Sequence, residues 1–148
     1  MNRTAFSIYN ASAGSGKTHT LVKEYLKILM LDKSYDGYRK ILAITFTNKA
    51  VNEMKSRIVS ALYAFSLPEI DNKNAQMLQQ IAEESGLESL VIREKSKIII
   101  KNIIHNYAAF DISTIDKFTH KVIRSFATDL ELSVTFEVSL DTQLLLQE

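Results

Sequence analysis

The stretch that decides the fold is SIYNASAGSGKTHTLVKEYL, residues 7–26. It passes from apolar residues through a run of small ones into a segment with apolar residues at helical spacing. Residues 11–18, ASAGSGKT, fit the phosphate-binding loop: a small residue, four variable positions, then Gly-Lys-Thr. Ala11 stands where many such loops have glycine. We therefore expect a strand, a phosphate loop and a helix, the order in which ligands bind at the carboxyl ends of parallel strands.

The residue types in this loop suit a polyphosphate. Glycine lets the backbone bend so that successive N–H groups point at one phosphate cluster, and the following helix adds its positive end. Lys17 would reach the β- and γ-phosphates, and the Thr18 hydroxyl would ligate Mg²⁺. The residues expected to hold ATP are Ala13, Gly14, Ser15, Gly16, Lys17, Thr18 and His19. For His19, a solvent-exposed place on the helix is the competing interpretation.

Strands and helices alternate along the rest of the chain. Short apolar segments predict strands at 6–9, 40–46, 111–115 and 134–140. Helical spacing predicts helices at 18–31, from 48 to before Pro68, and at 74–85, 90–110 and 116–130. Thr47 or Asn48 would cap the second of these helices. Side chains expected to face inward are Val51, Met54, Ile58, Leu62 and Phe65 from the second helix, and Phe118, Val122, Phe126 and Leu130 from the last.

This order predicts an α/β fold, a parallel sheet of the P-loop NTPase kind with helices on both faces. Residues 1–66 would form the first part of the core, 67–110 a helical insertion, and 111–148 the return to the core. Leu144, Leu145 and Leu146 need a surface to bury against, so we expect a fragment of a longer protein.

Composition bounds the function. The 148 residues fit one domain, and the net charge of +1 means that any nucleic-acid contact must come from a local patch. The absence of cysteine excludes disulfides, thiolate zinc sites and iron–sulfur ligation, and favours a reducing compartment, here the cytoplasm. No stretch approaches the roughly 18 apolar residues of a membrane span, so we expect no membrane partner.

A second group of candidate residues follows the strand at 40–46, in ILAITFTNKAVNEMKSRI, residues 41–58. Thr45, Phe46 and Thr47 stand where the strand leaves the sheet, and Lys49 follows at the start of a helix. Hydroxyls, a helix N-terminus and a lysine can hold backbone phosphates, and Phe46 could stack on a base. In the competing interpretation, Phe46 belongs to the core and the threonines are helix caps.

ASAGSGKT followed by ILAITFTNKAVNEMKSRI resembles motifs I and Ia of the UvrD/Rep-like superfamily 1A DNA helicases. A third segment, ISTIDKFTHKVIRSFA at 112–127, is similar to the family's TIHSF element. The sequence of the loop and its position near the start of the chain look most like the RecB/AddA branch of helicase–nuclease proteins. The resemblance covers roughly residues 5–66 and 110–140. It implies an incomplete RecA-like motor domain 1A, in which residues 67–110 would correspond to the 1B insertion.

The resemblance also implies roles. Lys17 and Thr18 would be the catalytic residues. Contacts to single-stranded DNA would come from Thr45, Phe46, Thr47, Asn48, Thr114 and Phe118. Asp116 stands where the family often has histidine; because a carboxylate repels phosphate, we expect it to cap the following helix instead. The parent would be an ATP-dependent 3′–5′ helicase in DNA repair or recombination. Its second motor domain would follow in the same polypeptide, with a nuclease elsewhere in the parent or in a partner protein.

Hydrolysis needs more than a phosphate cradle. One carboxylate must hold Mg²⁺ and another must position water. No Asp-Glu pair follows an apolar run in this sequence, and Asp111 is the candidate that comes nearest to this pattern. The arginines of a second motor domain are also missing, and the family's upstream glutamine element has no room. We therefore expect the isolated chain to lack ATPase activity. Two alternatives stay open: a nucleotide-binding module without catalysis, and another P-loop enzyme such as a small-molecule kinase.

Overall fold

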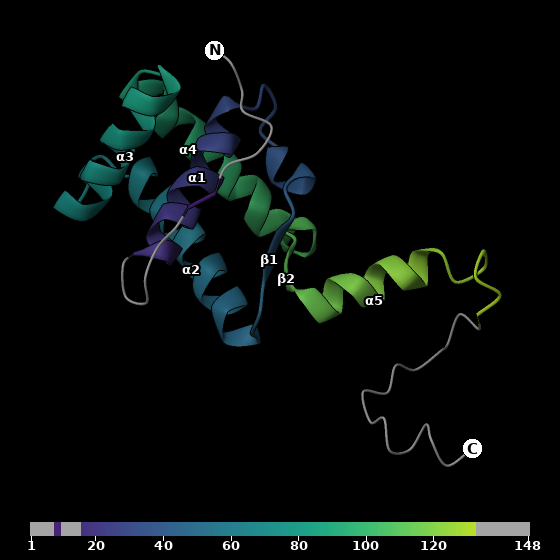
Figure 1. Cartoon of the computed structure of the whole chain (residues 1–148). Helices are drawn as coiled ribbons and strands as arrows, with labels where there is room; N and C mark the ends of the chain where they lie inside the picture. Colours follow the sequence, from purple (N-terminus) through teal and green to yellow (C-terminus); the bar gives the residue numbers. More distant parts are fainter. Residues whose placement is uncertain (1–7, 10–15, 133–148) are drawn as a thin grey trace.

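The computed structural model describes residues 8–9 and 16–132 of the chain. Most of these residues are helical, and two short strands form a parallel sheet beside the helices (Figure 1). The elements are α1 (Lys17–Leu31), β1 (Ala43–Thr45), α2 (Asn48–Ser66), α3 (Asn72–Ser85), α4 (Ser89–His105), β2 (Ile112–Thr114) and α5 (Ile115–Ser125), with 3₁₀ turns at Gly37–Lys40 and Tyr107–Ala109.

The sheet pairs two segments that lie far apart in the sequence. Ala43 pairs with Ile112, and Thr45 pairs with Thr114. Because the chain passes through α2, α3 and α4 between these strands, the connection is a crossover, as a parallel pair requires. The strands predicted at 40–46 and 111–115 are thus confirmed, although both are shorter than expected, and Lys40 belongs to a 3₁₀ turn at Gly37–Lys40.

The other two predicted strands are not part of this sheet. Ile8 and Tyr9 have no regular secondary structure and are exposed, so the predicted buried strand at 6–9 is wrong for these two residues. Phe6, Ser7 and the segments 134–140 and 141–148 lie outside the described residues. In the described part of the chain the parallel sheet therefore has two strands.

Helix α2 is the centre of the packing and contacts α1, α3, α4 and both strands. Its predicted inward residues, from Val51 to Phe65, are all buried as expected. They belong to one apolar core that also includes Leu26 of α1, Ile81 of α3 and Ile99 of α4. Removing these side chains from water is the main force that holds the helices together. The division of the chain at residues 67 and 111 stays a prediction.

Polar contacts add to this core at the junction of α1 and α3. Glu84 of α3 pairs with Lys27 of α1 at 2.6 Å and also with Lys23. Hydrogen bonds from Lys23, and then from Lys27, hold the pKa of Glu84 below its ordinary value. Helix α1 is therefore joined to α3 by charge as well as by apolar packing.

Helix α5 differs from the prediction. It leads away from the other helices (Figure 1) and ends at Ser125 rather than at residue 130. Of the side chains expected to face inward, Phe118 is half-buried, whereas Val122, Phe126 and Leu130 are 38%, 54% and 55% exposed. The spacing correctly predicts an amphipathic helix, but the described segments leave its apolar side chains from Val122 onward largely exposed.

Candidate nucleotide and single-strand sites

The end of the predicted phosphate loop, at the start of α1, lies within the described residues. Gly16 is the residue before the helix, and its φ of 80° lies in the left-handed region that favours glycine. Lys17 and Thr18 are the first two residues of α1 and lie at its positive end. Ala13, Gly14 and Ser15 lie outside the described residues, and their part in the loop stays a prediction.

The side chains at this helix end suit a nucleotide with Mg²⁺. Lys17 is exposed, and it lines a cavity of about 130 Å³ together with Tyr9, Thr20 and Leu21. Thr18 is half-buried beside it. A lysine ammonium, a threonine hydroxyl and a helix N-terminus are the groups that hold β- and γ-phosphates and the metal in P-loop proteins. The arrangement therefore supports the roles expected for Lys17 and Thr18.

His19 points elsewhere. It lines a second cleft, of about 140 Å³, between α1, α2 and α3, whose other lining residues include Arg57 and Lys73. The cavity lined by Lys17 does not include His19. Contact between His19 and a nucleotide stays a prediction, and this placement does not favour it.

The register of the sheet brings together the two segments that were predicted to face DNA. Since Thr45 pairs with Thr114, the residues that follow them, Phe46 and Ile115, leave neighbouring strands at the same edge. Phe46 is 86% exposed, so the interpretation that placed it in the core is wrong. Its ring is available to stack on a base.

The threonines that flank Phe46 have structural partners. The Thr47 hydroxyl accepts a hydrogen bond from the Ala50 N–H at 3.1 Å, which confirms Thr47 as the cap of α2. The Thr45 hydroxyl donates to the Thr47 carbonyl at 3.2 Å. Asn48, the first residue of α2, is exposed. The DNA contacts of Thr45, Thr47 and Asn48 stay predictions. Asn48 is exposed, whereas the hydroxyls of Thr45 and Thr47 form hydrogen bonds within the chain.

The cap of α5 is Thr114, so the prediction that Asp116 caps this helix is wrong. Thr114 is only 5% exposed, and its hydroxyl accepts from the Lys117 N–H at 3.3 Å, so Thr114 caps α5. The expected cap, Asp116, instead lies exposed in the first turn, where its charge complements the helix dipole. The DNA contacts of Thr114 and Phe118 stay predictions, and burial weighs against the hydroxyl of Thr114.

Asp111 is engaged in an ion pair. Its carboxylate accepts a hydrogen bond from Lys121 at 2.6 Å. Burial, and after it the negative charge of Asp111, raises the pKa of the Tyr25 phenol far above its ordinary value. Among the described residues, no cluster of three or more histidine and carboxylate side chains is placed to hold a metal ion. The binding of phosphate by Lys17 and Thr18, and the part of Asp111 at the site, stay predictions.

Comparison with known proteins decides the family. Residues 4–147 match the model of the UvrD/REP helicase N-terminal domain. The chain belongs to this family. As a member of the UvrD/REP family it has RecA-like ancestry, which accounts for the parallel β1–β2 pair joined by a helical crossover. No solved structure matches the chain.

Relatives of this UvrD/REP family member are much longer proteins. The chain is 33% identical over 129 residues to an ATP-dependent DNA helicase Rep of Buchnera aphidicola, covering 84% of this chain and 17% of the relative. It is 30% identical over 133 residues to an ATP-dependent helicase/nuclease subunit of Bacillus cytotoxicus, covering 90% of this chain and 9% of the relative. The corresponding helicase/nuclease subunit of Limosilactobacillus reuteri is 32% identical over 143 residues, covering 95% and 8% respectively. The chain thus spans less than a fifth of each of these relatives.

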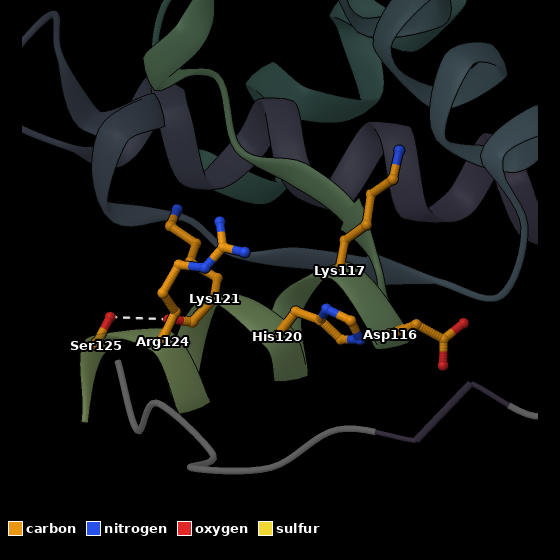
Figure 2. Close-up of a pocket in the computed structure, with 6 residues that line it drawn as sticks. All are labelled: Asp116, Lys117, His120, Lys121, Arg124 and Ser125. Carbon is orange, nitrogen blue, oxygen red and sulfur yellow. Dashed lines mark hydrogen bonds between the residues drawn. The ribbon is translucent and has the colours of Figure 1, made fainter. Parts of the chain in front are cut away.

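Sequence reasoning missed one group of residues in this family member. Lys117, His120, Lys121 and Arg124 lie along one side of α5, next to Thr114, and line a groove (Figure 2). Their spacing of three and four residues places them on one helical face and could have revealed them. None of the helices in the described part of the chain is long and apolar enough to cross a membrane.

Proposed function

We propose that this chain is the ATP-binding N-terminal segment of the first motor domain of an ATP-dependent DNA helicase. The observation that supports it best is the pairing of Thr45 with Thr114. This pairing places the two segments that resemble DNA-contact motifs at one edge of the sheet, where Phe46 is exposed to solvent. The family match over residues 4–147 supports the same assignment.

In this proposal, Lys17 and Thr18 hold the phosphates and Mg²⁺ of ATP. The left-handed Gly16 and the positive end of α1 provide the backbone part of the cradle. Bound Mg²⁺ would neutralise charge that develops on the transferred phosphoryl group. Asp111 is held by Lys121, so the water-positioning and metal-holding carboxylates come from elsewhere in the parent polypeptide.

The proposal extends to the parent protein. It would translocate 3′ to 5′ on single-stranded DNA with a second motor domain in the same polypeptide, in DNA repair or recombination in the cytoplasm. The relatives from Bacillus cytotoxicus and Limosilactobacillus reuteri are named as helicase/nuclease subunits, which supports a nuclease in the parent or in a partner protein.

The experiment is strand displacement by the complete gene product that carries this segment. The substrates are duplexes with either a 3′ or a 5′ single-stranded tail. We expect ATP-dependent displacement from the 3′-tailed duplex, lost in Lys17→Ala and kept in the matched control Lys33→Ala, which removes an exposed lysine outside the site. ATP hydrolysis that is indifferent to DNA, with no displacement from either substrate, would contradict the proposal.

A non-catalytic role is the second candidate, and the ion pair between Asp111 and Lys121 favours it for the chain alone. In that case the segment binds nucleotide without turning it over. Single-turnover hydrolysis by the isolated chain tests this role: stoichiometric product that requires Lys17 would exclude it.

A further inference from the structure

The cleft between α1, α2 and α3 has no part in the proposed function. These three helices pack against one another, and the cleft lies where the first half of α1 meets the first half of α3. Its volume is about 140 Å³. The lining side chains that bear on its chemistry are His19 and Val22 from α1, Ser56 and Arg57 from α2, and Lys73 and Met77 from α3.

The floor of the cleft is apolar. Val22 and Met77 line it, although only 2% and 6% of their surface is exposed, and both belong to the main core. Because methionine is unbranched and adaptable, this floor can adjust to the shape of an apolar group that enters. Pockets for small molecules and cofactors usually measure ~300–1,000 Å³. The cleft therefore has room for one apolar side chain but not for a whole nucleotide.

The rim of the cleft has hydrogen-bond donors from all three helices. His19 is half-buried, whereas Arg57 and Lys73 are exposed. Arg57 pairs with Glu53 at 2.8 Å, yet its side chain is still 46% exposed. In the described part of the chain, no carboxylate lies within the 4.0 Å of an ion pair with Lys73, and the nearby Asp71 is engaged as the cap of α3. The rim therefore has an excess of positive charge.

The direction of the helices adds to this charge. Lys23 and Lys27 of α1 pair with Glu84 near the end of α3. At the other end of the same helices, His19 and Lys73 share the cleft. Helices α1 and α3 therefore run in the same direction, and the positive N-terminal ends of both lie beside the cleft. A carboxylate is stabilised at such a helix end.

An apolar floor inside a basic rim suits an acidic peptide better than other anions. A free phosphate would meet the cations but leave the floor uncovered. Single-stranded nucleic acid binds by stacking its bases on aromatic side chains, and no described phenylalanine, tyrosine or tryptophan lines this cleft. A peptide in which an apolar side chain lies between carboxylates would cover the floor and pair with the rim at the same time.

We propose that this cleft docks an acidic segment of a partner protein, with one apolar side chain on the floor and flanking carboxylates on Arg57 and Lys73. His19 and Ser56 are placed on the rim to donate further hydrogen bonds to the peptide. Glu53 weakens binding because it competes for Arg57. The cleft shares no lining residue with the cavity at the predicted phosphate loop, so the inference does not rest on nucleotide binding.

The test is the binding of fluorescent peptides to the full chain, read by anisotropy. The probe has one leucine with two glutamates on each side, and two further peptides replace either the leucine with alanine or the glutamates with glutamines. Arg57→Gln with Lys73→Gln should weaken binding of the probe by roughly tenfold or more, because two charge-assisted contacts are lost. The matched control, Lys33→Gln with Lys101→Gln, removes two exposed lysines elsewhere and should leave the affinity unchanged. Glu53→Gln should tighten binding.

Both altered peptides should bind more weakly than the probe. Equal binding of the alanine peptide would show a basic surface without an apolar pocket, and equal binding of the glutamine peptide would exclude the charge. Unchanged affinity in the double variant, an equal loss in the control, or no saturable binding of the probe to the wild type would also overturn the inference. Displacement of the probe by Mg²⁺–ATP would instead assign the cleft to a nucleotide, and displacement by oligo(dT) at equal charge would assign it to nucleic acid. Circular dichroism melts check that every variant folds, and Lys73→Gln alone serves if the double variant does not.

Discussion

Replacing Phe46 with alanine distinguishes a binding surface from a buried core. The side chain is 86% exposed, so its removal uncovers almost no apolar area and leaves no cavity. We expect the free energy of unfolding to change by no more than ~0.5 kcal/mol, the usual range for surface substitutions. A phenylalanine in the core would instead cost ~3–5 kcal/mol.

Binding should respond in the opposite way. Stacking of a base on an aromatic ring contributes ~1–3 kcal/mol. Since 1.4 kcal/mol corresponds to a factor of ten, Phe46→Ala should weaken binding of oligo(dT) by roughly 5- to 140-fold. The loss should be similar for oligonucleotides of different sequence, because every base offers a face for stacking.

The assay combines thermal melts with anisotropy titrations on the same preparations. Phe65→Ala is the matched control for stability: Phe65 is fully buried in α2, and its truncation should lower the melting temperature sharply. Our reasoning would be refuted by a collapsed melting temperature in Phe46→Ala, which would place the ring in the core. Unchanged affinity together with an unchanged melt would remove its stacking role.

Three further predictions follow from contacts in the described residues. Thr47→Ala should destabilise the chain by about 1 kcal/mol, because the N–H of Ala50 loses its cap; urea unfolding measures it, with the exposed Ser60→Ala on the same helix as a neutral control. Glu84→Gln should destabilise by less than about 1 kcal/mol near neutral pH. Because the pKa of Glu84 is depressed below its ordinary 4.5, this contribution is present above that value and disappears as pH falls through the lower folded pKa. The melting temperatures of the wild type and Glu84→Gln should therefore converge in acid. A difference that stays constant with pH would show that the charge of Glu84 does not contribute. The isolated chain should not turn over ATP, with or without single-stranded DNA; turnover that disappears in Lys17→Ala would show that the carboxylates we consider missing are not needed.

Local pattern was enough to predict helix α2. Its apolar residues recur at helical spacing, from Val51 to Phe65, and a capping threonine precedes it, so both its buried face and its start follow from the sequence. The strands β1 and β2 could likewise be predicted, because short apolar runs between helices are typical of buried parallel strands.

The features that the sequence could not predict depend on which segments of the chain pack against each other. Amphipathic spacing indicates that α5 has an apolar face, but not that Val122 and Phe126 would be largely exposed in the described structure. Two polar residues could cap α5; the choice of Thr114 over Asp116 follows from where β2 ends. Similarly, the position of Phe46 next to the end of β2 depends on the register in which β1 pairs with β2. The apolar residues of the two strands do not by themselves specify that register.

The central claim is that the start of α1 is a phosphate cradle, and calorimetric titration of the chain with Mg²⁺–ATP tests it most directly. We predict weak, saturable binding to the wild type, no measurable binding to Lys17→Ala, and unchanged affinity in Lys33→Ala, with all three proteins giving the same melt before titration. Equal affinity of the wild type and Lys17→Ala for Mg²⁺–ATP would contradict the account.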